Sequence, residues 1–438
     1  MPGGIWTTQN KVRPGAYINF KSLGQALSPI SDRGIVAIPL VLSWGAKKEV
    51  IDLDSNSNFM ELLGYSFSNS ELLLIKEIFK RAKKVLLYRV NGGTKASIIS
   101  GTLTVTAKYE GIRGNAITVV IEEDIDNAGT FIVSTYLEGT KVYEQIGTTI
   151  ESLQNNAYVE YSGTGALVAS AGLVLAGGTD STATSQDYID YFSAIEIYDW
   201  NTMALPIDDE TIKASCVAFI NRLRNDEGKK VQAILANYPS ADHEGIISVK
   251  NGVKLTDGTV IDKVKATAWV AGVTAGAEIN KSNTYTAYED SVDVDIRYTN
   301  TQIIEALNSG EFVFVENNGR AVVEQDINTF LSYTAEKGKE FRKNRVIRTL
   351  DSIGNDIKSI FSNYYIGKVD NTPDGRNLFK AEIIKYMESL QGINAIQNFN
   401  SSTDVTIAEG IEIDAIVVNI GAQPVDSIEK LYMTVTLV

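Results

Sequence analysis

The residues best suited to chemistry in this sequence are its one histidine and its one cysteine. His243 could serve as the base of a Ser-His-Asp triad, but a metal site built on paired histidines is excluded. It falls in the segment SADHEG, which we predict to be a solvated surface loop. Cys216 shares a helical face with Ile212, Phe219 and Leu223, where a small buried hydrophobe is the default interpretation of a thiol. Neither residue predicts an active site.

Binding of phosphate or metal would need a glycine-rich loop or suitably spaced acids. No G-x-x-x-x-G-K-[ST] segment occurs, and no G-x-G-x-x-G opens a helix after a predicted strand. The acids of the segment 122–126 lack the spacing of an EF-hand loop, and Asp290, Asp293 and Asp295 look like one solvated strand face. A cation could bind either group. The sequence nevertheless predicts no catalytic residue, no cofactor and no metal site.

Composition limits the class of protein. With 438 residues the chain is long enough for several domains, each with its own core. A net charge of −14 argues against a partner made of nucleic acid. The most apolar run, 166–176, is far shorter than the roughly 20 residues of a membrane helix, so no membrane insertion is expected. The segment MPGGIWTTQN lacks the features of a signal peptide, which favours synthesis in the cytoplasm.

The elements that would carry any function alternate between strands and helices. An apolar strand at 34–44, in which Pro39 requires a bulge or an edge, precedes a helix at 70–84 and a strand at 85–90. Helices at 187–195 and 208–225 and a strand at 230–236 resume this texture. Between them, short alternating runs separated by Gly and Asn turns predict a small all-β insertion. The sequence therefore predicts a layered α/β core with an inserted β domain.

The last hundred residues predict an α+β domain. The longest helical pattern covers 335–364, and its first half carries a local basic face in an acidic protein: Lys337, Lys339, Arg342, Lys343, Arg345 and Arg348. A second helix is predicted at 374–390. Before them, Glu316-Asn317-Asn318-Gly319 predicts a tight hairpin, because Asn-Gly tolerates positive φ.

Two closing strands, 411–418 and 431–438, complete the predicted C-terminal domain. A terminal strand left bare would be an aggregation-prone edge, so it must pair within the chain or with a neighbour. At the other end, Pro14-Gly15 is followed by the alternating segment 16–20, which predicts a detached arm ending in a strand. The predicted domains are an arm (1–20), a core in two parts (21–99 and 181–334), the β insertion (100–180) and the C-terminal domain (335–438).

Several segments, in their order and spacing, carry a resemblance to a known family. They are RPGAYINF at Arg13–Phe20, RGIVAIPLVLSWG at Arg33–Gly45, YEGIRGNAITV at Tyr109–Val119, ATAWVAGVTAG at Ala266–Gly276 and NRVIRTLDSI at Asn344–Ile353. Together they resemble contractile phage tail sheath proteins. The likeness is greatest to the sheaths of PBSX-like prophages and R-type bacteriocins of Gram-positive bacteria.

The resemblance implies a structural subunit that polymerises helically in stacked rings around an inner tail tube protein. Contraction by rigid-body rearrangement would drive the tube through a cell envelope, with baseplate and tail terminator proteins as further partners. Assembly would take place in the host bacterial cytoplasm, in a phage tail or a tailocin particle released on lysis. The β insertion would lie on the outer face and the C-terminal domain next to the tube.

The resemblance also assigns residues to assembly. Intersubunit strands would comprise Ala16, Tyr17, Ile18 and Phe20 of the N-terminal arm and Leu431, Met433, Val435 and Leu437 at the other end, unless both strands pair within their own subunit. On the helix 374–390, Lys380 and Lys385 are candidate tube contacts, although a plain solvated helix face fits equally. The alternative function is an α/β enzyme or a small-molecule-binding protein with an inserted β domain.

Overall fold

The computed structural model describes residues 3–4, 16–17 and 33–437, which form two compact units. The larger unit contains residues 32–355, 394–397 and the chain from 423 onward. The smaller unit contains residues 356–393 and 398–422 together with the described N-terminal residues 3–4 and 16–17. Helix α7 (Asn344–Tyr364) contributes its first part to the larger unit and its remainder to the smaller one.

A seven-stranded sheet is the centre of the larger unit, with the strand order β20-β16-β15-β14-β3-β5-β4. Its strands run parallel except β4, which is antiparallel to β5 at one edge. Strand β3, the first strand of this sheet along the chain, thus lies between strands that come later, as in doubly wound α/β folds. The strands are β3 (Ile35–Leu40), β4 (Val50–Asp54), β5 (Lys84–Arg89), β14 (Thr202–Ala204), β15 (Gln232–Ala236), β16 (Ile246–Val249) and β20 (Glu311–Phe312).

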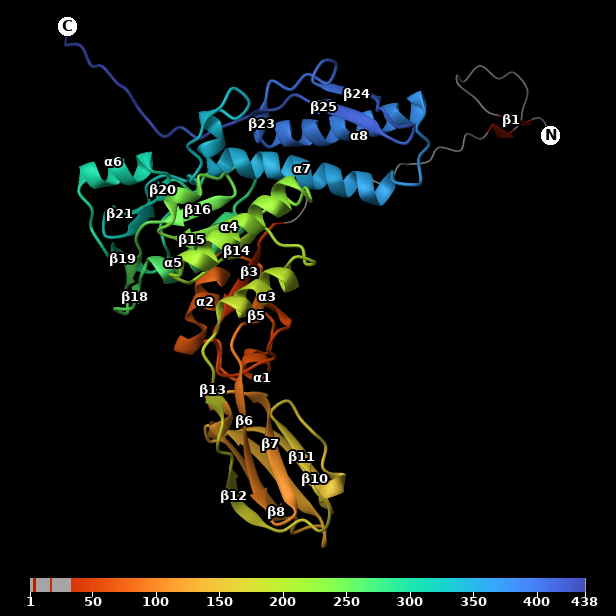
Figure 1. The fold of residues 1–438 in the computed structure, drawn as a ribbon, viewed down its shortest axis with the longest axis vertical. Coiled ribbons are helices and arrows are strands. Elements are labelled where there is room, and N and C mark those ends of the chain that lie inside the picture. The colour runs from red at the N-terminus through yellow and green to blue at the C-terminus, as the bar shows by residue number, and fades with distance from the viewer. Residues whose placement is uncertain (1–2, 5–15, 18–32, 438) are drawn as a thin grey trace. The chain divides into compact units, whose positions relative to one another are not determined.

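Helices cover both faces of this sheet, and Figure 1 shows them around its strands. Val36 and Ile38 join one apolar cluster with α2 (Leu73–Phe79) and α5 (Lys263–Gly276). Ala37 joins the other cluster, with α3 (Ser185–Ile195) and α4 (Glu210–Asn225). The alternation along β3 explains why a continuous apolar run forms a strand buried on two sides. Further helical segments are α1 (Phe59–Leu63), η1 (Ser70–Leu72), η4 (Pro239–Ala241) and α6 (Asn300–Asn308).

Pro39 lies in a central strand and not at a bulge or at the edge of the sheet. It pairs with Tyr88 of β5, whereas β14 on the other side pairs only with Val36 and Ala37. The neighbouring strand has therefore ended before the proline is reached. A missing N–H is tolerated there because no ladder bond is required on that side.

The inserted β domain is a sandwich of two four-stranded antiparallel sheets, ordered β10-β9-β8-β12 and β11-β7-β6-β13. Inward side chains such as Leu103, Val105 and Ala107 alternate with outward ones and fill a separate apolar core. Its strands are β6 (Gly93–Ser100), β7 (Leu103–Glu110), β8 (Ile117–Glu123), β9 (Phe131–Leu137), β10 (Thr140–Gly147), β11 (Val159–Ser162), β12 (Ser170–Val174) and β13 (Thr179–Asp180), with η2 (Ile112–Ala116) and η3 (Ile150–Ser152).

Three small sheets complete the larger unit. Strands β17 (Val253–Leu255), β18 (Val260–Ile261) and β19 (Ser291–Val294) form one of them, and β23 (Ile396–Gln397) with β26 (Gln423–Pro424) forms another. The third is the hairpin of β21 (Phe314–Glu316) and β22 (Ala321–Val323). Asn318 and Gly319 have positive φ, so the turn predicted at 316–319 is confirmed.

The long helix begins later than predicted. Residues 335–343 contain only the short η5 (Lys339–Arg342), and α7 starts at Asn344. Lys343 has extended φ and ψ and forms a bridge to Ile327, which prevents the helix from extending backwards. The prediction of helix across 335–343 was therefore wrong.

The smaller unit combines α8 (Pro373–Gly392) with a hairpin of β24 (Val405–Glu409) and β25 (Ile416–Ile420). The closing strand predicted at 411–418 is shifted, because residues 411–415 form the turn between these two strands. The Gly410 N–H donates to the Ala415 carbonyl there, and the Ala415 N–H donates to the Glu412 carbonyl. Near the N-terminus, β1 (Gly3–Gly4) and β2 (Ala16–Tyr17) pair in parallel.

The fold class is confirmed as an α/β and α+β multidomain chain with a layered core and an inserted β-sandwich. The predicted terminal strand 431–438 is not formed within the single chain: residues 427–437 have no strand partner among the described residues. Among those same residues, no helix combines the length and apolar character needed to cross a bilayer.

Candidate functional site

Cys216 is buried, as its helical spacing predicted. Its side chain is fully buried in α4, with Sγ 3.9 Å from Sδ of Met203. Burial raises the pKa of the thiol to about 12. A thiol that remains protonated at neutral pH is a poor nucleophile and acts as a small apolar side chain.

His243 is half-buried, whereas the sequence predicted a solvated loop residue. Its Nδ1 accepts from the Gly245 N–H at 2.9 Å, and its main chain exchanges two hydrogen bonds of 3.1 Å with the Thr329 hydroxyl. Burial lowers the pKa of the imidazole. The hydroxyl beside it bonds to main-chain atoms, so the pair does not have the geometry of a nucleophile and its base.

The acidic segments do not assemble a metal site. In the part of the chain that the structure describes, no three side chains of His, Cys, Asp or Glu are grouped to hold an ion. Asp124 is instead used within its own loop, where it accepts from the Asp126 N–H at 3.0 Å and from Asn127 at 2.9 Å.

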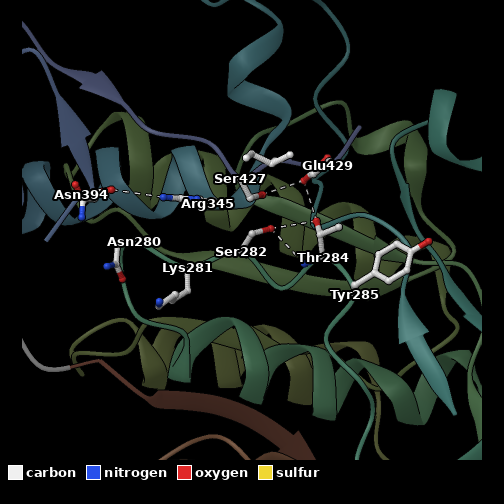
Figure 2. Close-up of a pocket in the computed structure, with 10 residues that line it drawn as sticks. Asn280, Lys281, Ser282, Thr284, Tyr285, Arg345, Asn394, Ser427 and Glu429 are labelled. Carbon is white, nitrogen blue, oxygen red and sulfur yellow. Dashed lines mark hydrogen bonds between the residues drawn. The ribbon is translucent and has the colours of Figure 1, made fainter. Parts of the chain in front are cut away.

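The base of the C-terminal segment, residues 423–429, is held to the larger unit by strand pairing, hydrogen bonds and an ion pair. After β26 pairs with β23, the Val425 N–H donates to the Ala395 carbonyl at 3.0 Å. The Glu429 carboxylate then accepts from the Thr284 hydroxyl at 2.9 Å and from Gln325 at 2.7 Å, and it forms an ion pair with Lys343. Figure 2 shows this side chain pointing toward Thr284.

Beyond Glu429, the apolar residues of the segment 431–437 are exposed. The exposed fraction of the residue is 82% for Leu431, 74% for Met433, 75% for Val435 and 97% for Leu437. A run of large apolar side chains that packs on nothing is rare on a monomer surface and marks a site of interaction. The structure thus separates a fixed base at 423–429 from a free apolar segment at 431–437.

The other predicted assembly residues are placed only in part. Ala16 and Tyr17 form β2 and pair with Gly3 and Gly4, whereas Ile18 and Phe20 lie outside the described residues. On α8, Lys385 is exposed and Lys380 half-buried, and the described residues give neither lysine an ion pair. The opposite face of α8 is buried through Phe379, Ile383, Tyr386, Met387 and Leu390.

The basic run 337–348 does not form the single basic face that we predicted. Lys337 pairs with Glu244 at 2.8 Å, and Lys343 pairs with Glu429. Arg348 is fully buried, with its guanidinium 3.4 Å from Asp326. Helical spacing could not predict this, because the first residues are not helical and the helix turns its arginines toward the larger unit's interior. No sequence pattern indicated the anchoring role of Glu429 either.

Models of phage tail sheath proteins match the chain in four consecutive stretches. The matched regions are the domain III N-terminal region of tail sheath protein Gp18 at residues 33–90, the tail sheath beta-sandwich domain at 90–180, the central domain at 181–329 and the C-terminal domain at 336–437.

Individual relatives agree. The crystal structure of a sheath tail protein from Desulfitobacterium hafniense is 53% identical, has a TM-score of 0.87, and is covered over 99% of its length by 96% of this chain. Two Bacillus subtilis (strain 168) proteins are similar over 99% of both chains: the uncharacterized protein YqbK, at 41% identity, and the phage-like element PBSX protein XkdK, at 39%.

Proposed function

The chain belongs to the phage tail sheath protein family, and from this membership we propose that its subunits are joined by strands exchanged through their termini. The predicted resemblance is thereby confirmed, including the PBSX relative. The protein is a structural subunit of a tail sheath and not an enzyme, so the alternative of an α/β enzyme or ligand-binding protein is set aside. Its assembly and movement would depend on contacts between copies of the chain.

The observation that carries the proposal is the contrast between the anchored base at 423–429 and the exposed segment 431–437. Leu431, Met433, Val435 and Leu437 alternate with more polar positions, the pattern of a strand with one face to bury. Adding such a strand to a neighbour's sheet gives main-chain hydrogen bonds for affinity and alternate side chains for specificity.

An acceptor sheet is available in the smaller unit. Among the described residues, β24 and β25 pair only with each other, which leaves both outer edges of this hairpin open. We propose that the segment 431–437 of one subunit and the arm residues Ala16, Tyr17, Ile18 and Phe20 of another add to these edges. Contacts of this kind do not close on themselves, so they generate a helical polymer.

The remaining assignments extend this proposal. The C-terminal domain would face the tube, the β-sandwich would lie outermost, and baseplate and terminator proteins would bind the ends of the polymer. Contraction would move subunits as rigid bodies while the exchanged strands keep them connected, with no hydrolysis required. Assembly would take place in the bacterial cytoplasm.

Removal of residues 431–438 tests strand exchange. Burying each of the four apolar side chains is worth about 1.5–3 kcal/mol, so the shortened protein is expected to fold but not to form tubes. Circular dichroism and thermal unfolding would measure folding, and sedimentation with negative-stain imaging would measure assembly.

The matched variants for this test place charge on the two faces of the segment. Met433→Lys with Val435→Lys should abolish tubes, whereas Thr434→Lys with Thr436→Lys, on the alternate face, should reduce them less. Tubes that form normally from the shortened protein would refute the proposal.

Lys380 and Lys385 are the proposed tube contacts. Replacing both with Glu reverses the charge at the exposed Lys385 and the half-buried Lys380, and it leaves the buried residues of α8 unchanged. We expect the variant to polymerise yet to lose most of its co-sedimentation with purified tubes, and the effect should weaken at high salt. Unchanged co-sedimentation would show that α8 does not meet the tube through these lysines.

A further inference from the structure

A polar pocket of about 670 Å³ lies beside the base of the C-terminal segment. Its walls come from the segment 280–285, the first turn of α7, Asn394 and residues 427–429. Figure 2 shows Arg345 between Asn394 and Ser427 in this pocket. All of these residues belong to the larger unit.

Arg345 is a buried cation without an anion. The residue is 9% exposed, its Nε has no hydrogen-bond partner, and its Nη2 donates only to the Asn394 carbonyl, at 3.5 Å. No carboxylate of the described residues lies within ion-pair distance, although Asp426 acts from farther away. Burial lowers the pKa of the guanidinium. A buried charge without a close counter-charge is costly, so binding an anion here is favourable.

The rest of the pocket is also suited to an anion. Lys281 is exposed at the pocket and has no ion pair within the described part of the chain. The pocket's own carboxylate, Glu429, is already engaged by Lys343, Gln325 and Thr284. A planar guanidinium with a lysine nearby matches a carboxylate, which it can bind through two parallel hydrogen bonds.

We propose that this pocket binds the Glu412 carboxylate of a second copy of the chain. Glu412 lies at the tip of the β24–β25 hairpin between Ile411 and Ile413, whose exposures are 103% and 86%. Its carboxylate has no hydrogen bond or ion pair to any described residue. In a chain with a net charge of −14, a free acid and an unpaired buried cation form a complementary pair.

Two other acids are less suitable. Asp414, on the same tip, lines a cavity of its own unit that also contains Arg376. The sandwich loop around Ile125 also places an exposed isoleucine between acids, but Asp124 there is engaged by its own loop. Glu412 is flanked by two exposed isoleucines, whereas Asp126 adjoins only one, so Glu412 is assigned as the ligand and Asp126 serves as the control.

This inference rests on the sheath polymer of the proposed function, since a polymer places two different surfaces of identical subunits in contact. It does not depend on strand exchange. The two can fail separately: loss of the terminal segment tests the strands, and the pocket is tested with both termini intact.

The experiment compares Arg345→Met, Glu412→Gln and the double variant of the full-length chain. Each single change should raise the protein concentration needed for tube formation by about tenfold, the size expected for a charge-assisted hydrogen bond. The double variant should be no worse than either single one, because the two residues act as one pair. The controls Lys265→Met and Asp126→Asn, which alter exposed charges elsewhere, should assemble like the unmodified protein.

Thermal unfolding of the unassembled protein separates this role from a structural one. Removing an uncompensated buried charge should leave the unfolding temperature of Arg345→Met unchanged or higher. Should that variant not fold, the exposed Lys281→Met replaces it. Additive effects in the double variant, or normal assembly by Glu412→Gln, would overturn the assignment. A failure of the unmodified chain to form tubes would count against the proposed function itself.

Discussion

At the scale of single residues, Glu429 makes the last side-chain contacts that hold the C-terminal segment before its exposed part begins at Leu431. Burial alone would raise the pKa of this carboxyl, but hydrogen bonds from Lys343, Gln325 and Thr284 outweigh it and hold the pKa below its usual range. A carboxyl whose pKa is lower in the folded than in the unfolded protein stabilises the fold at pH values above its unfolded-state pKa. That stabilisation is lost as the pH falls through the pKa of the folded state.

Glu429→Gln should therefore loosen the base at 423–429. A hydrogen bond to a charged group contributes about 1.5–3 kcal/mol, so the Val425 amide, bonded to the Ala395 carbonyl, should exchange its hydrogen at least tenfold faster near neutral pH. The difference from the unmodified protein should vanish once the pH is well below the ordinary glutamate pKa of about 4.3. Hydrogen exchange followed by mass spectrometry at each pH measures this.

Asp426→Asn is the control for that experiment. Its carboxylate is 3.6 Å from the same Lys343 ammonium and is the more exposed of the two, at 39% against 11%. We expect little change in exchange, because an exposed ion pair contributes little. Equal effects from both variants would mean that general charge, and not the Glu429 hydrogen bonds, holds the base.

Individual residues were predictable where the local pattern determines their environment. Cys216 lies on an apolar helical stripe, so its burial follows from spacing alone. Arg345 and Glu429 could not be predicted in this way. The environment of each depends on residues that lie tens to hundreds of positions away in the sequence. Thr284, for example, donates to Glu429 from 145 positions away.

At the scale of elements, periodicity predicted the type of most helices and strands but was poorer at their ends. Helix α4 begins at Glu210, capped by the Asp209 side chain, close to the predicted start. The predicted start of the long helix at 335 was wrong. The backbone is extended at Gly338 and at Lys343, so the helix is interrupted where the residue types alone suggested that it continues. Boundaries fail where a tertiary contact, here the bridge to Ile327, overrides propensity.

The terminal strand illustrates a different limit. Alternating β-branched and apolar residues at 431–438 predict a strand, yet β-structure requires a partner edge. Within the described chain none lies beside this segment, and its side chains are exposed. A sequence can therefore predict that a segment is suited to pairing without indicating whether the partner belongs to the same molecule.

At the scale of the whole molecule, the β-sandwich is connected to the core by two adjacent strands. The chain enters through β6 and leaves through β13, which pair at Gly93 and Asp180. Paired strands are about 4.7–4.9 Å apart, so a short turn can join these points. The sandwich has its own apolar core, which explains how it can be inserted between β5 and α3 without altering the order of the main sheet.

Replacing residues 93–180 with a two-residue Asn-Gly turn should therefore yield a folded core that still assembles, if the sandwich lies outermost as proposed. Stability should fall, because Trp44 packs on Tyr109 and Tyr158 of the sandwich and would become exposed. Arg89 would lose its bond to the Glu110 carbonyl and keep the one to Gly45, both 2.9 Å long. Thermal unfolding and negative-stain imaging would measure the two effects.

Adding Trp44→Ser to the same replacement is the matched control, because it removes the apolar surface that the deletion uncovers. It should reduce aggregation without changing the form of the tubes. The deletion and the removal of 431–438 then give opposite outcomes: the first loses the whole sandwich and retains assembly, and the second loses eight residues and abolishes it. If the deletion protein folds but stays unassembled while Trp44→Ser prevents aggregation, the sandwich must itself contribute a contact between subunits.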